Sequence, residues 1–191
     1  MKQFSTVKIT TTALCIVINF VGAYIALVLR LPIYLDSIGT ILSAALLGPF
    51  FGVLSACLSS FLSGITSDVY ALYFMPVGIM TGWLAGLLFR THWFQKKKLP
   101  LGILFLTVPG TIVGACITAF LFDGITSSGS SILLQILNHM GLSMVASAFI
   151  VQFLTDYTDR LISVIIVILI SSRLGDRFKI LLNGGKANKS L

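Results

Sequence analysis

The polar side chains that could take part in chemistry are concentrated in three segments between hydrophobic runs. Segment 30–40 contains Asp36, segment 64–74 contains Asp68 and two tyrosines, and segment 123–139 ends in Asn138 and His139. Small-molecule sites are mostly apolar and aromatic, with a few polar groups that fix the ligand's orientation. We therefore predict a ligand site at one face of the protein, formed by Asp36, Asp68, Tyr70, Tyr73, Asn138 and His139.

Each of these residues also has a purely structural interpretation. Asp36 and Ser37 could cap the helix that follows them, and Asp68 could form a turn. The tyrosines could belong to an aromatic belt at a membrane interface. The Asn138–His139 pair interrupts an apolar run, and a hydrogen bond to a loop carbonyl would explain it. The sequence leaves these alternatives open.

The motifs of common catalytic sites are absent from the sequence. It contains no GxxxxGK(S/T) phosphate-binding loop, no HExxH and no GxSxG, so we predict neither ATP hydrolysis by this chain alone nor catalytic residues. Asp156 and Asp159 are followed by Arg160, and we interpret them as the solvated, ion-paired start of a helix. The three cysteines lie inside apolar runs without metal-type spacing, so we expect no metal, disulfide or cofactor.

Composition and charge indicate an all-α integral membrane protein. The 191 residues are 57% hydrophobic and 10% charged, with a mean hydropathy of +1.02, so lipid must be the main solvent. Eleven of the 13 basic residues lie before the first apolar run, between the middle runs, or after the last one. They are Lys2, Lys8, Arg90, Lys96, Lys97, Lys98, Arg173, Arg177, Lys179, Lys186 and Lys189. The positive-inside rule then places both termini in the cytoplasm, and the scattered charge does not indicate nucleic-acid binding.

The apolar runs predict a single membrane domain, residues 1–191, built as a six-transmembrane-helix bundle. The spans are expected near 9–29, 38–48, 50–64, 74–90, 101–121 and 157–172, with Gly48–Pro49 as the turn between two short helices. Segment 132–153 contains the most polar residues of all the apolar runs. We therefore expect it to form an additional, partly helical segment at the outer face instead of a span. Residues 179–191 are predicted to be a cytoplasmic tail.

Small residues recur at a spacing of four, which brings them onto one face of a helix and lets helices approach closely in lipid. On the first helix this pattern predicts a surface for docking a partner membrane protein, formed by Cys15, Asn19, Gly22, Ala23 and Ala26. The alternative is that Asn19 bonds a neighbouring helix of the same bundle. No ionisable residue is expected at the centre of a span, which argues against ion-coupled transport by this chain alone.

Three stretches resemble the substrate-binding S components of energy-coupling-factor (ECF) vitamin transporters. They are Leu31 to Thr40 (LPIYLDSIGT), Leu47 to Gly52 (LGPFFG), and Asp159 to Ser163 (DRLIS), and the similarity extends over roughly residues 9–175. The sequence departs from that family in two places. The last span begins with Asp159–Arg160 where Asp-Lys is common, and the family's Ala-xxx-Ala docking motif reads Ala13-xxx-Val17.

The resemblance implies a six-helix protein of the bacterial cell membrane that binds a vitamin or vitamin precursor near the outer face. It also implies a transmembrane coupling protein and two ATPase subunits as partners, which would supply the energy for uptake. Cobalamin-type compounds, pantothenate and other B vitamins remain open as ligands. A small membrane-embedded enzyme or assembly factor and a self-contained secondary transporter are the alternatives.

Overall fold

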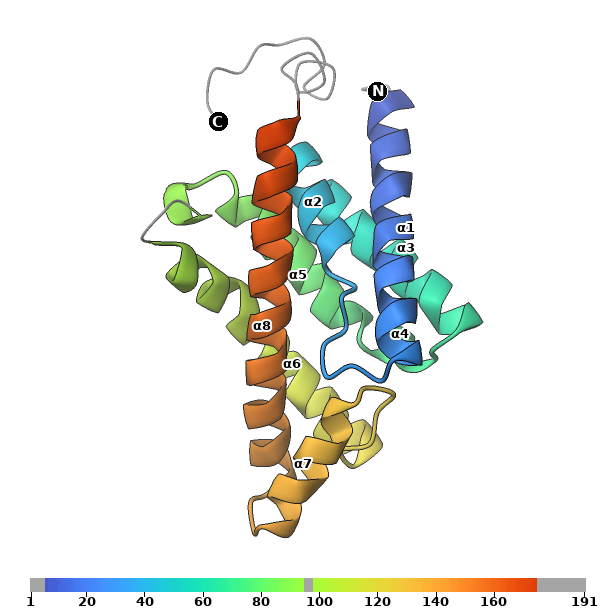
Figure 1. The fold of residues 1–191 in the computed structure, drawn as a ribbon, viewed down its shortest axis with the longest axis vertical. Helices are drawn as coiled ribbons and strands as arrows, with labels where there is room; N and C mark the ends of the chain where they lie inside the picture. Colours follow the sequence, from blue (N-terminus) through green and yellow to red (C-terminus); the bar gives the residue numbers. More distant parts are fainter. Residues whose placement is uncertain (1–5, 95–97, 175–191) are drawn as a thin grey trace.

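The computed structural model describes residues 6–94 and 98–174, and this part of the chain is helical, without strands (Figure 1). The helices are α1 (Thr6–Val28), α2 (Ile38–Leu47), α3 (Pro49–Thr66), α4 (Tyr70–Tyr73), α5 (Met75–Leu88), the 3-10 turn η1 (His92–Phe94), α6 (Leu99–Phe122), α7 (Ser130–His139) and α8 (Met144–Arg173). Lys96, Lys97 and the predicted tail 179–191 lie outside the described residues.

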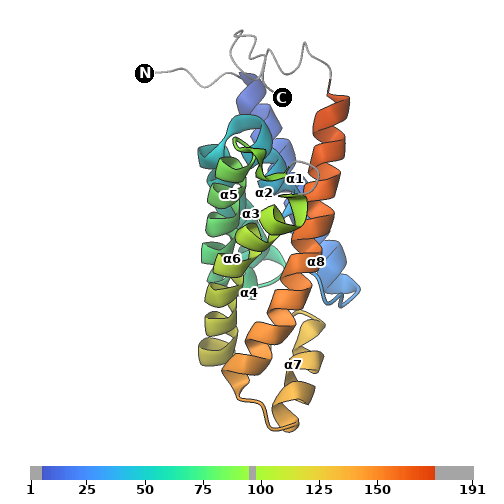
Figure 2. The ribbon, with the colours of Figure 1, turned by 90° about the vertical axis from the view of Figure 1, so that its left-hand side faces the viewer.

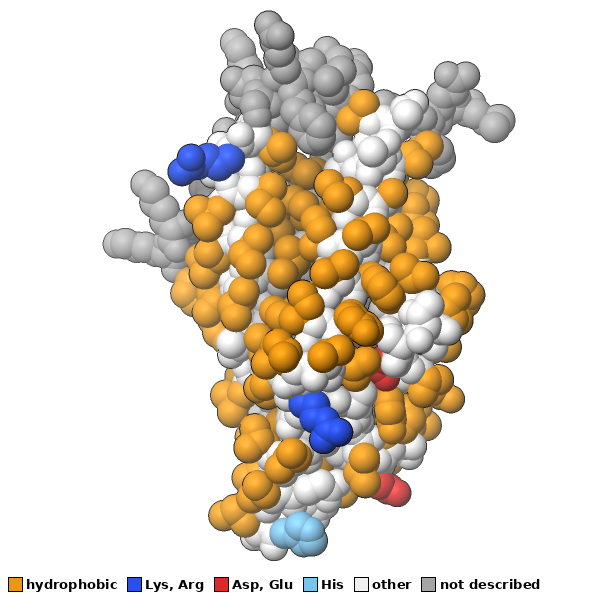
Figure 3. All heavy atoms as spheres, turned by 45° about the vertical axis from the view of Figure 1, so that its right-hand side comes forward, with side chains coloured by type: hydrophobic (Ala, Val, Ile, Leu, Met, Phe, Trp, Pro, Cys, Tyr) orange, Lys and Arg blue, Asp and Glu red, His pale blue; other side chains and the backbone are white. Residues whose placement is uncertain are grey.

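Within the described residues, three helices are long and apolar enough to cross a membrane: α1, α3 and α6. Two further apolar helices, α2 and α5, are shorter. Hydrophobic side chains cover most of the face shown in Figure 3. Water-soluble proteins rarely expose apolar patches of this size. Such a surface is typical of a protein whose solvent is lipid.

The short helix α2 lies at the centre of the bundle and packs against α1, α3, α5 and α8. Its residues Gly39 to Ala44 are all buried. The helix ends at Gly48, whose φ of 101° is readily adopted only by glycine, and Pro49 occupies the first turn of α3. Two helices therefore meet at Gly48–Pro49, at the turn that the sequence predicts.

Helices α3 and α5 touch through their backbones. A methyl group added to Gly82 would lie 2.5 Å from the carbonyl carbon of Gly52, and one added to Gly86 would lie 2.5 Å from the Cα of Pro49. Side chains larger than hydrogen would therefore force the two helices apart. The Gly78/Gly82/Gly86 spacing thus holds α5 close to α3, as expected for small residues at a helix interface in lipid.

The last third of the chain differs from the sequence-based expectation. Segment 132–153 is not one outer-face unit: α7 ends at His139, and residues from Met144 onward belong to α8. Helix α8 has 30 residues and is about 45 Å long, rather than beginning near 157. It starts where the Ser143 hydroxyl accepts the Ala146 backbone N–H at 3.3 Å. In its middle, neighbouring elements hydrogen-bond the side chains of Asp156, Asp159 and Arg160.

The first turn of α1 and the last turn of α8 lie at the same end of the molecule (Figures 1 and 2). Helix α7 lies at the opposite end, where it packs against α8. The loop between α1 and α2, residues 29–37, runs between α1 and α8 in the half of the bundle nearer to α7 (Figure 1). This arrangement sets the position of the polar cavity.

Candidate ligand-binding cavity

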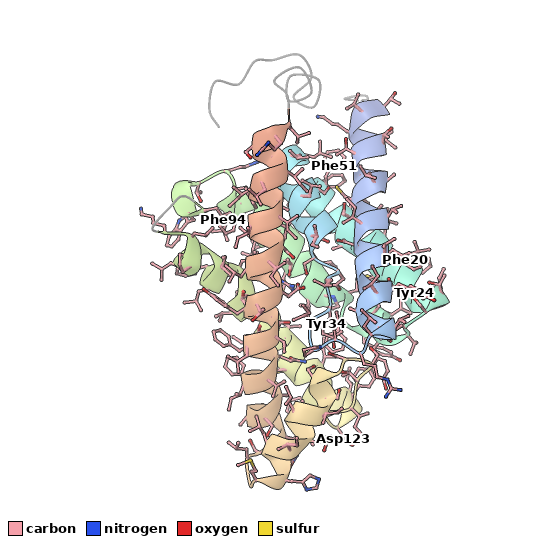
Figure 4. The ribbon with its side chains drawn as sticks, in the orientation of Figure 1. Phe20, Tyr24, Tyr34, Phe51, Phe94 and Asp123 are labelled. Atoms are coloured by element: carbon pink, nitrogen blue, oxygen red, sulfur yellow. The ribbon has the colours of Figure 1, made fainter. Side chains whose placement is uncertain are left out.

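A cavity of about 90 Å³ lies inside the bundle, beside the α1–α2 loop. It is lined by that loop, by residues of α1 to α6 and α8, and by Ser127 and Ser128 of the connection between α6 and α7. Tyr34, on the α1–α2 loop, lines this cavity in the space between α1 and α8 (Figure 4). The walls are mixed: serines and threonines alternate with aliphatic and aromatic side chains.

Arg160 is the central charged group of this region, and its side chain is almost fully buried. Its Nη1 donates to Asp159 Oδ2 at 2.7 Å and to the Ser37 hydroxyl, and its Nη2 donates to Thr81 Oγ1 at 3.1 Å. The other oxygen of Asp159 accepts the backbone N–H of Leu35 at 2.9 Å. One ion pair of α8 therefore holds both the α1–α2 loop and α5.

Three further carboxylates, Asp36, Asp68 and Asp156, line the cavity without an ion-pair partner among the described residues. Asp36 accepts the Ser37 hydroxyl at 3.1 Å, and Asp156 accepts the Thr111 hydroxyl at 2.8 Å. Asp36 lies in the loop, and its exposed side chain lines the cavity. The loss of surrounding water, followed by the charge of Asp159, raises the pKa of Asp36 to about 6, while Arg160 opposes the shift.

Asn19 of α1 caps the N-terminus of α2 from a neighbouring helix. Its Oδ1 accepts the backbone N–H groups of Gly39 at 2.7 Å and Thr40 at 3.2 Å, which are free donors in the first turn of α2. Its Nδ2 donates to the hydroxyls of Thr40 at 2.8 Å and Ser59 at 3.2 Å. The expected cap by Asp36 or Ser37 is not formed, because the Ser37 hydroxyl bonds Arg160 and Asp36 instead.

The connection between α6 and α7 closes the cavity on the side of the α1–α2 loop. Asp68 accepts the Ser127 hydroxyl and, at 3.1 Å, the backbone N–H of Tyr70. The backbone N–H of Gly129 donates to the Leu31 carbonyl at 3.2 Å, and a methyl group on Gly129 would collide with the Arg30 carbonyl. Backbone and side-chain bonds thus fasten this connection to both neighbouring loops.

The predicted ligand residues separate into two groups. Asp36, Asp68 and Tyr70 line the cavity. Tyr73, Asn138 and His139 do not: Tyr73 is 49% exposed and stacks edge-on against Phe122, and the other two end α7. The Asn138 amide donates to the sulfur of Met144 at 3.4 Å, a contact between α7 and α8.

Sequence reasoning missed the contribution of α8. Gln152, Asp156 and Arg160 line the cavity, and the interpretation of Asp156 and Asp159 as a solvated helix start is wrong, since Asp159 is 2% exposed in the middle of the helix. Asp159 and Arg160 are thus buried charges within a helix, which the sequence analysis did not anticipate. In the sequence, the spacing of four between Gln152, Asp156 and Arg160 indicates that these polar side chains lie on one helix face, and this pattern could have revealed the contribution of α8.

The small-residue face of α1 also has a different role from the predicted one. Cys15, Asn19 and Ala26 are buried, a methyl group on Gly22 would collide with the Leu35 carbonyl, and Ala23 lines the cavity. This face packs against α2 and the α1–α2 loop, so it is not free to dock another protein. The alternative left open for Asn19, a bond within the bundle, is the one observed.

The sequence profile of the family described as "ECF transporter, substrate-specific component" matches residues 7–171, most of the chain. This chain belongs to that family. No curated protein and no solved structure matches it significantly. As a substrate-specific component of an ECF transporter, the chain is a membrane protein that takes part in transport, and such components work with an energy-coupling module.

Membership in this family supports a role as a transporter component, whereas the expected lack of ionisable residues inside the protein does not. With Asp159 and Arg160 buried in α8, a lack of interior charge no longer separates this chain from a self-contained transporter. The family is a transporter component and not an enzyme.

The Asn19 cap gives a stability prediction. Asn19→Ala removes the acceptor of two buried N–H groups, and each unsatisfied donor costs about 1–3 kcal/mol, so the midpoint of thermal unfolding in detergent should fall markedly. Thr107→Val is the control, because the buried Thr107 hydroxyl bonds the Ile103 carbonyl of its own helix. Equal unfolding midpoints for the two variants would show that the cap does not stabilise the bundle.

Proposed function

We propose that this chain is the substrate-binding subunit of an ATP-driven uptake transporter for a vitamin or vitamin precursor, with its ligand held in the cavity described above. The observation that carries the proposal is the cavity itself, in a member of the substrate-specific family. It combines aromatic rings, hydroxyls and charged groups in one enclosed space, as small-ligand sites do. Asp36, Asp68 and Tyr70 are its proposed ligand residues from the sequence, joined by Tyr34, Gln152 and Asp156.

The size of the cavity favours a small ligand. A cavity of about 150 Å³ admits benzene, and this one is smaller, at about 90 Å³. A ligand with one or two rings would enter only if the surrounding loops moved outward, and a cobalamin-type corrinoid would require a far larger displacement. We therefore favour a compact B vitamin or precursor over a corrinoid.

A second hollow of about 470 Å³ supports an entry route between the loops. It is lined by Arg30, Gly129 and Ile132 among others, and it shares Leu27, Ser127 and Ser128 with the cavity. Ser127 and Ser128 thus lie on the wall between the two spaces. Moving these two residues would open the cavity toward the α7 end of the molecule.

We further propose that the α7 end faces outward and that both termini are cytoplasmic, in a six-span arrangement of α1, α2, α3, α5, α6 and α8. The basic residues support this orientation. After replacement of the native cysteines, a cysteine at Met140 should react with a membrane-impermeant thiol reagent in intact cells, and one at Lys98 should react only after the membrane is opened. The reverse pattern would invert the topology.

The energy source is proposed to be a separate module, a transmembrane coupling protein with two ATPase subunits. The chain carries no phosphate-binding loop of its own. In proteoliposomes, a labelled small B vitamin that the purified chain binds should be accumulated only when the coupling module and ATP are present. Accumulation by the purified chain alone under an ion gradient would contradict the proposal.

The same vesicles test the location of the site. Ala71 lines the cavity, so Ala71→Phe should fill part of it and reduce uptake at least tenfold. Val69→Phe is the matched control, since Val69 lies two residues away, is 56% exposed and does not line the cavity. Equal uptake by the two variants would place the site elsewhere.

A further inference from the structure

We infer that the cavity selects an organic cation, a ligand that carries a protonated amine or a positively charged nitrogen heterocycle. The inference rests on the proposed function, because it assigns a chemical class to the ligand of the same site. Three independent features of the walls support it: their charge balance, an unused hydrogen-bond acceptor and their aromatic rings.

The ionisable side chains in and beside the cavity wall carry more negative than positive charges. Four of the six acidic residues of the chain contribute to the cavity or its immediate wall, namely Asp36, Asp68, Asp156 and Asp159. One basic residue, Arg160, lines the cavity beside them, and its guanidinium pairs with Asp159. Asp36 and Asp156 therefore face the cavity without an ion-pair partner among the described residues. Asp36 is exposed and Asp156 is half-buried, so both carboxylates are accessible from the cavity, and a cationic ligand would form an ion pair with them there.

Gln152 provides the second feature. Its side chain is 7% exposed and lines the cavity, and its Nε2 donates to the Thr118 hydroxyl. Its Oε1 has no hydrogen-bond partner within the described part of the chain. Buried carbonyl oxygens are rarely left without a donor. A ligand N–H would satisfy this oxygen, one turn of α8 away from Asp156.

The aromatic rings distinguish an organic cation from a metal ion. Tyr34, Tyr70 and Phe74 line the cavity, and the rings of Tyr34 and Phe74 have centroids 6.3 Å apart. Aromatic faces attract organic cations and stack on flat heterocycles. No group of three or more His, Cys, Asp or Glu side chains within residues 6–94 and 98–174 is arranged to hold a metal ion.

An anionic ligand would find little to bind here. The guanidinium of Arg160 already donates to Asp159, Ser37 and Thr81, so it is engaged by the protein. A carboxylate or phosphate would also approach Asp36 and Asp156, and like charges at close range repel strongly where water is excluded.

The test separates natural metabolites by charge. A small-molecule extract of bacterial cells is divided by ion exchange into cationic, anionic and neutral fractions, and each is added to the purified full chain in detergent. We expect the cationic fraction to raise the midpoint of thermal unfolding, because a ligand that binds the folded state stabilises it. The active compound is then isolated from that fraction and titrated against the variants.

Two substitutions remove one cavity charge each while keeping the shape of the side chain. Asp36→Asn and Asp156→Asn should weaken binding of the isolated compound about 10- to 100-fold, as expected for loss of a charge-assisted hydrogen bond. In Asp156→Asn the new side-chain carbonyl can still accept the Thr111 hydroxyl, and unfolding without compound checks that each variant folds. Asp123→Asn is the control: Asp123 is exposed, does not line the cavity, and has a φ of 45°, which asparagine tolerates.

Stabilisation by the anionic or neutral fraction alone, or unchanged affinity in both cavity variants, would overturn the charge assignment and leave the binding function intact. If no fraction stabilises the chain, the proposed binding function itself fails, and the inference fails with it.

Discussion

Arg160 carries its guanidinium into the interior of the bundle, where Asp159 pairs with it and Leu35, Ser37 and Thr81 complete the hydrogen bonds. Removing one partner of such a buried pair costs about 3–5 kcal/mol, because the other charge is left uncompensated. The pair therefore fixes the position of its partners on the α1–α2 loop and on α5. Through these bonds, residues 35–37 are held against the middle of α8.

The rest of the cavity follows from that loop position. With the loop drawn into the bundle, α2 begins deep inside it, at Ile38, and spans only 10 residues. Its first N–H groups are then buried and need an acceptor, which Asn19 supplies from α1. The space between the loop, α3, α5 and α8 remains open as the cavity, and Asp36 and Asp156 face it without partners of opposite charge among the described residues. A single guanidinium thus organises a site whose walls retain a negative charge.

Features with a local cause could be predicted from the sequence. Hydrophobic runs predicted the helices up to α6, and Gly48–Pro49 predicted the turn. Asp36, Asp68 and Tyr70 lie in polar segments between these runs, and all three line the cavity. What failed depends on partners distant in sequence. Asp156, Asp159 and Arg160 looked like a solvated helix start because their partners, Thr111, Leu35 and Thr81, lie 45 to 124 residues away. The small residues of α1 gave a packing face, but spacing alone does not say whether that face meets its own bundle or another protein.

An experimental density map of the chain with its stabilising metabolite bound would show directly whether the ligand lies in the cavity. We expect density for a small molecule in the cavity, with a nitrogen within hydrogen-bond distance of Asp156 or Asp36 and a ring against Tyr34. Density for the metabolite outside the bundle, for example against Asn138 and His139 on α7, with only water in the cavity, would contradict it.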